Sequence, residues 1–411
     1  MVKVASFRFC AAVIALGSFA VYFASSFALV ARDGTTHFGG DPWLYTELAR
    51  TDPFTDVGKI AYVIRIHPMT GLLGLAWMKL ASPLSFWLTP EEILRCLFAG
   101  FGAVGVRAAI SAFAIVIPRR EALLWGAIYA SSLGVWYFSS IEESKALTAT
   151  LTAIYTAVYL RLRESWTLRR AMLLTFVLAA ACLNEIVAIF LVAIPAVDSL
   201  VRSGVNVRQC YWIGIHATVG PIALSVMEVA SRILLAPSER PEGSDHIGLL
   251  IWFIQNNYVS LERLYNFLTR WLLFNVAAPQ SKAITWADPS LRYGGDFDNS
   301  IANYFQAPVT AWLVVLALAV LITSIVPRIR EALSKDTCAL LLGLSAYGFI
   351  RSVFFLAFNP GECMLYASGT TLAFLLLIAI PFATARIPVK GVLLFSIFVL
   401  LQVTNGRFIV G

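Results

Sequence analysis

Long apolar stretches recur along the whole chain, and short polar segments separate them. Examples are 7–30, 311–326 and 370–383. With their flanking residues, each is long enough, or nearly so, to cross a hydrocarbon layer about 30 Å thick as an α-helix. A backbone in lipid must satisfy its own hydrogen bonds, and these stretches lack the strict alternation of barrel strands. The pattern predicts an all-α, polytopic transmembrane bundle of about ten to twelve helices.

Composition supports this prediction over a soluble protein with a very large core. The sequence has 411 residues, of which 59% are hydrophobic and 13% are charged. A soluble domain of this length has about a quarter of its residues charged. We therefore expect one integral membrane domain over 1–411, with no separate soluble domain.

The basic residues form short clusters between apolar segments, which is typical of cytoplasmic loops. With the N-terminus inside, every cluster can stay on that side: Arg119 and Arg120; Arg161, Arg163, Arg169 and Arg170; Arg202 and Arg208; Arg328, Arg330 and Lys335; Arg386 and Lys390. The first apolar stretch follows Lys3 and Arg8 and is expected to be an anchor helix rather than a removed signal peptide. The formal net charge is +7, but the basic residues do not form a patch with interleaved aromatic residues. We therefore expect no nucleic-acid partner.

This threading places two long loops at the outer face. Residues 32–67 form a first outer loop with short helices, and 231–306 form a second loop with a helix-like pattern over 258–273. Both mix aromatic residues, glycine, proline and charges of both signs, which is typical of folded loops with a function.

Two segments decide the threading. If 68–88 crossed the membrane fully, the basic clusters after it would fall outside, so we expect it to lie in the interface or to re-enter. The apolar run 171–196 is interrupted by Asn184 and Glu185. One span with a buried carboxylate would cost several kcal/mol. We therefore favour two short helices that meet at a polar elbow.

The first outer loop holds the densest set of polar residues. Gly39 and Gly40 precede Asp41, and Pro42 favours a helix start, with Asp41 as its N-cap and Tyr45 one turn on. A cap alone would explain Asp41 structurally. Arg65 and His67 precede Pro68, and His67 suits either proton transfer or a simple interfacial hydrogen bond.

These motifs resemble the GT-C superfamily of membrane glycosyltransferases, which take sugars from polyprenyl-phosphate carriers. The resemblance is carried by Asp41, Tyr45 and Ala49, the Arg65-Ile66-His67-Pro68 run, and the segments 139–145, 183–185 and 359–366. It covers most of the chain in architecture, although its motifs are short. The first loop carries separated acids, Asp33 and Asp41, and no paired DxD motif.

The resemblance implies a role for each candidate residue. Asp41, with Asp33 second, would be the general base for the acceptor hydroxyl or amine. Arg65, Lys145 and Arg351 would meet the charge of the leaving phosphate. Structural alternatives are a snorkelling Arg351 and an ion pair between Lys145 and Glu142. The remaining expected substrate-binding residues are Tyr45, His67, Glu142, Glu143, Glu185, Glu362 and Tyr366.

The expected activity is hexosyl or pentosyl transfer from a polyprenyl-phosphate sugar to a lipid, glycan or protein acceptor. The site would face the periplasm if the membrane is a bacterial inner membrane. The resemblance leaves open a divalent cation, Mg²⁺ or Mn²⁺. The histidine spacing predicts no zinc site, and the Gly294–Asp298 run is expected to be a loop turn. Alternative functions are transport of a lipid-linked saccharide and a non-catalytic role in polysaccharide assembly.

Overall fold

A computed structural model of the chain describes eleven stretches of the sequence. They are residues 4–33, 45, 48–50, 67–164, 167–204, 206–234, 255, 261–278, 334–358, 363–384 and 389–410. All regular secondary structure in these stretches is helical. The predicted apolar stretch 311–326, the helix expected to start at Pro42, and most of both long loops lie outside the described residues.

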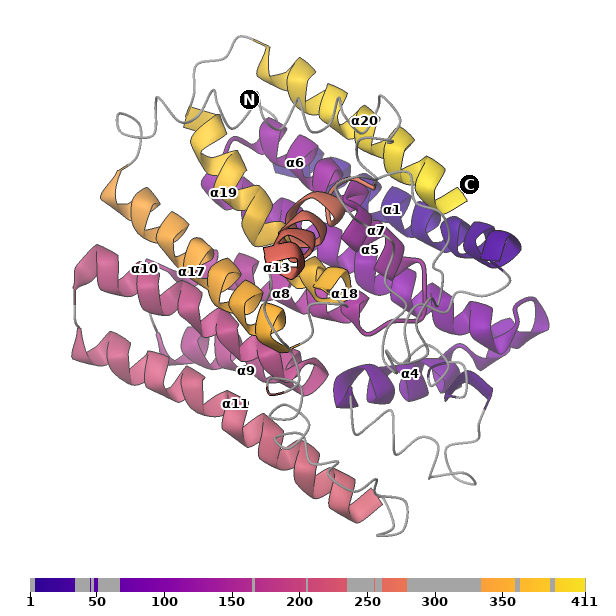
Figure 1. The fold of residues 1–411 in the computed structure, drawn as a ribbon, viewed down its shortest axis with the longest axis horizontal. Coiled ribbons are helices and arrows are strands. Elements are labelled where there is room, and N and C mark those ends of the chain that lie inside the picture. The colour runs from indigo at the N-terminus through magenta and orange to yellow at the C-terminus, as the bar shows by residue number, and fades with distance from the viewer. Residues whose placement is uncertain are drawn as a thin grey trace.

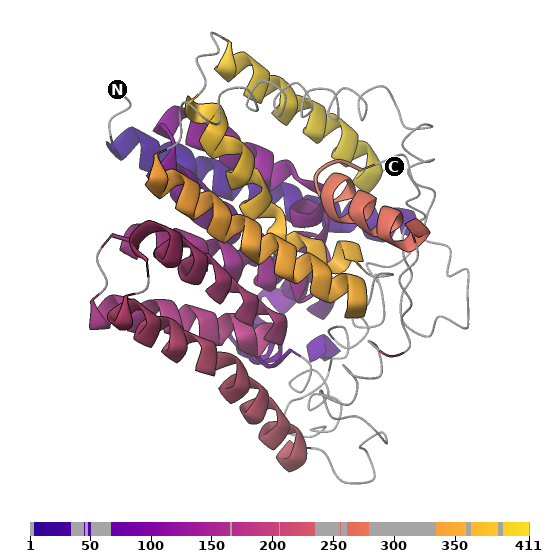
Figure 2. The same cartoon turned by 60° about the vertical axis from the view of Figure 1, so that its left-hand side comes forward.

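The first half of the chain contributes α1 (Val4–Asp33), α4 (Pro68–Leu80), η1 (Ser82–Phe86), α5 (Pro90–Val116), α6 (Arg119–Ser131), α7 (Leu133–Ser139), α8 (Lys145–Leu162), α9 (Leu168–Asn184), η2 (Ile186–Val192), α10 (Ala193–Ser203) and α11 (Val207–Leu234). The second half contributes α13 (Leu261–Leu268), η4 (Thr269–Phe274), α17 (Lys335–Phe358), α18 (Cys363–Ala367), η6 (Ser368–Thr370), α19 (Thr371–Thr384) and α20 (Lys390–Val410). α13 and η4 confirm the helical pattern over most of 258–273. Figures 1 and 2 show these helices packed into one bundle, with α11 along one edge.

Seven helices in the described part are long and apolar enough to cross a membrane. They are Ala5–Ala31, Pro90–Val116, Ile186–Ser203, Cys210–Val229, Lys335–Phe358, Leu365–Thr384 and Lys390–Val410. Leu365–Thr384 is the most enclosed of the seven. In its most apolar 18-residue stretch, 83% of the residues are buried, whereas the corresponding share in the other six helices is 28–44%. Exposed apolar residues on the outer helices, such as Phe9, Leu16 and Phe176, suit contact with lipid. The protein is therefore an all-helical, multi-pass membrane protein.

The boundaries of α5 follow from local sequence. Thr89 accepts a hydrogen bond from the backbone N–H of Glu92, and the Glu92 carboxylate accepts one from the backbone N–H of Thr89. This reciprocal capping box, with Pro90 in the first turn, satisfies donors that the helix start leaves free. The helix ends just before Pro118, where the chain cannot continue as a helix.

Basic residues gather at one end of the bundle, which we call the basic end. Arg119 lies over the ring of Phe7, so the start of α6 meets the start of α1. Lys390 lies 4.0 Å from Glu121, which brings α20 to the same place. α5 and α8 run parallel, because Thr150 donates to the backbone of Phe101 and the two helices pack along their lengths.

The end of α8 completes the basic end. Arg163 pairs with Asp198 on α10 and donates to the backbone carbonyl of Asp336 at the start of α17. The Arg202 side chain donates to the Arg163 carbonyl at 2.7 Å. The basic clusters in the described part therefore share one end, as the threading predicted.

The opposite end of the bundle carries Ser144, Glu185 and Arg351, and we call it the network end. The end of α1 reaches it, because Arg95 of α5 donates to the Ser26 carbonyl at 3.5 Å. α8 starts there, and α9 and α17 finish there.

The segment 67–89 begins and ends at the network end. At its start, the Thr70 hydroxyl donates to the Asn184 side chain. Further on, the Trp77 indole donates to the Ile93 carbonyl at 2.7 Å, near the start of α5. α4 has 13 residues, which gives a length of about 20 Å, less than a bilayer core. These contacts confirm the prediction that this segment does not cross the bundle.

Candidate functional site

The polar elbow between α9 and η2 is the centre of the site. α9 ends at Asn184, and Glu185 has extended backbone angles, φ −152° and ψ 109°. η2 and α10 then continue toward the basic end. This break confirms the predicted elbow. Glu185 is nevertheless only 6% exposed, so the elbow holds a buried carboxylate that needs partners.

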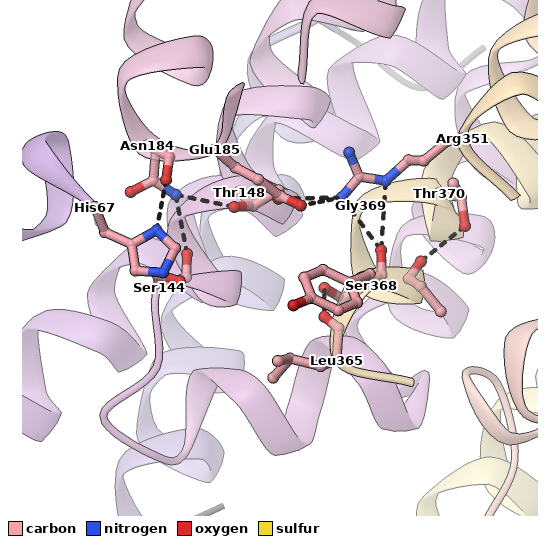
Figure 3. A network of polar contacts seen from close by, with 12 residues as sticks. His67, Ser144, Thr148, Asn184, Glu185, Arg351, Leu365, Ser368, Gly369 and Thr370 are labelled. Carbon is pink, nitrogen blue, oxygen red and sulfur yellow. Dashed lines mark hydrogen bonds and ion pairs between the residues drawn. The ribbon is translucent and has the colours of Figure 1, made fainter. Parts of the chain in front are cut away.

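Asn184 fixes the elbow to three neighbouring elements (Figure 3). Its amide nitrogen donates to the Ser144 carbonyl at 3.2 Å and to the Thr148 hydroxyl at 2.9 Å. Its side-chain oxygen accepts from Thr70. The His67 Nδ1 lies 2.7 Å from the Asn184 carbonyl oxygen. A carbonyl only accepts, so Nδ1 carries a hydrogen in this arrangement.

Arg351 is the partner of Glu185. Its Nη2 donates to both carboxylate oxygens, at 2.9 and 3.1 Å. Nη2 and Nε also face the Tyr366 carbonyl at 3.3 and 3.4 Å. The guanidinium is fully buried, yet Nη1 has no hydrogen-bond partner in the described part of the chain. One face of this buried cation is therefore left with unused donors.

Gly369 allows this close packing against Arg351. A Cβ at this position would come 3.0 Å from Nη2 of Arg351. That separation is tighter than a side chain tolerates without movement of its neighbour. The backbone of η6 therefore approaches the guanidinium more closely than another residue type would allow.

Lys145 is a second buried cation, at the first position of α8. The residue is 2% exposed, and its ammonium lies 4.7 Å from the centre of the Tyr366 ring. Among the described residues, no carboxylate lies within ion-pair distance of this ammonium. A positive charge at a helix N-terminus also opposes the helix dipole. Within the described residues, the cation–π contact with Tyr366 is the contact that holds the Lys145 ammonium.

Within the described residues, two buried cations, Lys145 and Arg351, lie beside the single carboxylate of Glu185 at the elbow. Two further buried acids, Glu142 and Glu143, lie in the adjoining loop. Burial disfavours ionisation of Glu185, but the charges of Arg351 and then Lys145 outweigh it and lower the pKa of this carboxyl. The carboxylate therefore stays ionised beside these two cations.

Aromatic rings support both cations from one side. Tyr366 stacks on Phe355 with ring centres 4.0 Å apart. Arg351 lies 5.0 Å from the centre of the Phe355 ring. Trp271 of η4 approaches the same ring at 5.9 Å. A segment of the second long loop therefore packs directly behind the charged cluster.

A second ion pair borders the site. Arg95 lies 3.4 Å from Glu142, and both side chains are buried. Ser144 donates to Glu143 at 2.9 Å. Glu142 thus pairs with Arg95 in α5, and the ion pair between Glu142 and Lys145 that the sequence allowed is not formed. The loop 139–144 is held between α5 and the elbow.

Five of the predicted residues meet in this network: His67, Lys145, Glu185, Arg351 and Tyr366. Figure 3 labels three of them, His67, Glu185 and Arg351. Glu142 and Glu143 lie in the loop beside it. Tyr45 is buried at the network end, where it packs on Phe98 with ring centres 5.7 Å apart.

Four other predicted residues are not placed by the structure. Asp41, Arg65 and Glu362 lie outside the described residues. Asp33 ends α1, and its side chain is not described. Within the described ranges, no three His, Cys, Asp or Glu side chains gather as metal ligands. The divalent cation that the resemblance left open stays untested.

Three residues of the network were not singled out by sequence reasoning. Asn184 was seen only as part of the elbow, although a buried amide before a carboxylate signals a need for several partners. Arg95 is a charged residue within the apolar run of α5, and this position in the sequence could have indicated a buried ion pair. Thr148 follows Ser144 by one helical turn, and nothing in its own sequence context marks it.

No protein-family model matches the chain, and no curated protein matches it in sequence.

Proposed function

We propose that the protein is a membrane glycosyltransferase of GT-C type that uses a polyprenyl-phosphate sugar as donor. The observation that carries this proposal is the pair of buried cations, Lys145 and Arg351, beside Glu185, with the Nη1 donors of Arg351 unbonded within the described residues. An anion that reaches the unused Nη1 donors of Arg351 and the Lys145 ammonium would pair with both cations. Guanidinium and ammonium groups bind phosphate oxygens well.

The proposed reaction needs this charge at one step. The acceptor oxygen or nitrogen attacks the anomeric carbon and loses its proton to a base. The bond from that carbon to the phosphate oxygen breaks, and its electron pair leaves with the carrier phosphate. Arg351 and Lys145 would stabilise the growing negative charge on that phosphate, and more so because the site is buried. Asp41 stays the proposed base, from the resemblance alone.

The other parts of the proposal follow from this chemistry. The donor would be lipid-linked, the acceptor a lipid, glycan or protein, and the bilayer itself would supply the donor. We place the site at the outer face of a bacterial-type inner membrane, because the basic end carries the residues expected in cytoplasmic loops.

The direct test is sugar transfer in proteoliposomes with a radiolabelled polyprenyl-phosphate sugar. We expect Arg351→Gln and Lys145→Met each to lower kcat/KM by about ten- to a hundredfold, the size of one lost charge-assisted hydrogen bond. Arg119→Gln is the matched control, because Arg119 is an exposed arginine at the basic end. This variant should transfer sugar at the wild-type rate. Asp41→Asn should abolish product with normal expression. Wild-type rates for Asp41→Asn would end the base assignment, and equal losses for Arg351→Gln and Arg119→Gln would end the phosphate role.

A second candidate function, transport of a lipid-linked saccharide, rests on a different observation. Ion pairs lie at both ends of the packed unit of α8, α10 and α17. Glu185–Arg351 is buried at the network end, and the buried Asp198 pairs with the partly exposed Arg163 at the basic end. Charged pairs at two ends of a bundle are what alternating access would open in turn. Movement of a fluorescent lipid-linked sugar between leaflets, with no transfer product, would favour this function over the enzyme.

A further inference from the structure

One face of α8 carries a row of buried hydroxyl groups, which we call the α8 stripe. It consists of Thr148, Thr152, Tyr155 and Tyr159, and each is at most 3% exposed. Positions separated by three or four residues lie on the same side of a helix. The stripe therefore runs along the interior of the bundle from the network end toward the basic end.

The two ends of the stripe are hydrogen-bonded to the two ion-pair regions. Thr148 accepts from Asn184, beside Glu185, at 2.9 Å. At the other end, the Tyr159 hydroxyl donates to the carboxylate of Asp198. The stripe thus has a buried carboxylate near each end.

The hydroxyl groups in the middle of the stripe differ from those at its ends in their hydrogen bonding. The Tyr155 hydroxyl is buried without a hydrogen-bond partner among the residues that the structure describes. The buried Thr152 hydroxyl faces the Tyr347 hydroxyl but makes no hydrogen bond of good geometry within those residues. The Ser199 hydroxyl, next to Asp198 in α10, is likewise buried without a partner in that part of the chain. Buried hydroxyls in proteins are rarely unbonded, because an unpaired polar group in an apolar interior costs free energy.

Successive members of the stripe are three or four residues apart, so their backbone positions are about 4.5–6 Å apart along the helix axis. One water molecule with hydrogen bonds of about 2.8 Å on each side bridges two oxygens about 5.5 Å apart. Buried water typically binds between polar groups that lack other partners.

We propose that the α8 stripe binds a row of water molecules that connects the Glu185–Arg351 pair with the Tyr159–Asp198 pair. Such a row passes protons by exchange: each oxygen takes up one hydrogen and gives another to its neighbour. No heavy atom moves, and the number of hydrogens on each group is restored. The row gives a proton a route between the two ends of the bundle, whether the protein transfers a sugar or transports one.

Radiolytic footprinting of the detergent-solubilised full chain tests the proposal. X-rays generate hydroxyl radicals from water, and these label a buried side chain only where bound water touches it. The matched control is Tyr22, which is also buried but donates its hydroxyl to the Ala130 carbonyl at 2.7 Å. We expect Tyr155 to be labelled several-fold faster than Tyr22. Equal, slow labelling of both tyrosines would overturn the proposal.

Two variants distinguish a connected row from a single water. Thr152→Val keeps the shape of the side chain and removes one hydroxyl of the row, so labelling of Tyr155 should fall at least severalfold toward the Tyr22 rate. Thr156→Val is the control, because the Thr156 hydroxyl already donates to the Thr152 carbonyl in its own helix at 2.9 Å. Fast Tyr155 labelling that Thr152→Val leaves unchanged would overturn the row. Size-exclusion profiles check that both variants fold.

Discussion

The two carboxylate–guanidinium pairs at opposite ends of the bundle, each with a buried carboxylate, differ in how completely they are bonded. At the basic end, Arg163 approaches Asp198 as a fork, with Nε and Nη2 at 2.6 and 2.7 Å from separate oxygens. At the network end, Arg351 reaches Glu185 through Nη2 alone and leaves Nη1 unbonded within the described residues. Within the described residues, Lys145 is a further buried cation beside the Glu185–Arg351 pair.

This difference separates a structural pair from a candidate binding site. An arginine that binds both oxygens of a carboxylate holds two helices together and leaves few donors for a ligand. A pair with spare donors and a further buried cation beside it is a poor structural element, because buried charge needs compensation. The following experiments test this distinction, from the largest expected effect on stability to the smallest.

Arg163→Met should be the most destabilising change. Asp198 is fully buried, and loss of its fork leaves a buried carboxylate with Tyr159 alone, which typically costs about 3–5 kcal/mol. Thermal unfolding in detergent, followed by tryptophan fluorescence, measures this loss. The double variant Arg163→Met with Asp198→Leu should recover much of it. A stable Arg163→Met protein would contradict the structural assignment.

Asn184→Ala should cost about 2–3 kcal/mol, because three side-chain hydrogen bonds of roughly 1 kcal/mol each are lost. The matched control is Asn405→Ala. Asn405 is equally buried and also makes three side-chain hydrogen bonds, to Ala278, Ser131 and Val276. We expect similar falls in the unfolding temperature for both variants.

Substrate affinity should separate the two asparagine variants. Only Asn184 adjoins Glu185, so only Asn184→Ala should weaken binding of a short-chain polyprenyl phosphate, measured by calorimetry in the folded range. Equal weakening by both variants would mean that the elbow has no particular link to the site.

Tyr366→Leu should have a smaller effect, on binding more than on folding. It removes the ring over which Lys145 lies, and a cation–π contact of a desolvated group is worth about 1–2 kcal/mol. We expect phosphate-lipid affinity to fall roughly five- to thirtyfold, in line with that energy. Tyr366→Phe keeps the ring and should bind within about twofold of wild type. If both variants bind alike, the ring does not position Lys145.

Lys145→Met should change stability least, by under about 1 kcal/mol in either direction. The change removes attraction to Glu185, but it also removes a buried ammonium and its unfavourable position at the start of α8. We expect the thermal unfolding midpoint of this variant to lie near that of wild type. Addition of a phosphate lipid should no longer raise that midpoint. A loss of stability as large as that of Arg163→Met would show that Lys145 is a structural cation.

The sequence predicted the helical class, the gathering of the basic clusters at one end, the short segment 68–88 that does not cross the bundle, and the elbow at 184–185. These features depend on local hydrophobicity and on charge, which a single segment reveals. The partners of Glu185 were not predictable in the same way, because Arg351 is 166 positions away and several arginines were available. Glu142 illustrates the limit: Lys145 is its neighbour in sequence, yet Arg95 of α5 is its partner.

Helix α4 has a consequence for the orientation of the whole protein. Each crossing of a bilayer switches the side on which the next loop emerges, so one extra crossing reverses all later loops. α4 has 13 residues, and this short length, with its contacts at the network end, keeps it from adding a crossing before α5. An insertion of about seven apolar residues, two further turns, would let this segment compete as a span. Lys145, Glu185 and Arg351 would then face the opposite compartment, with no change in their own sequence.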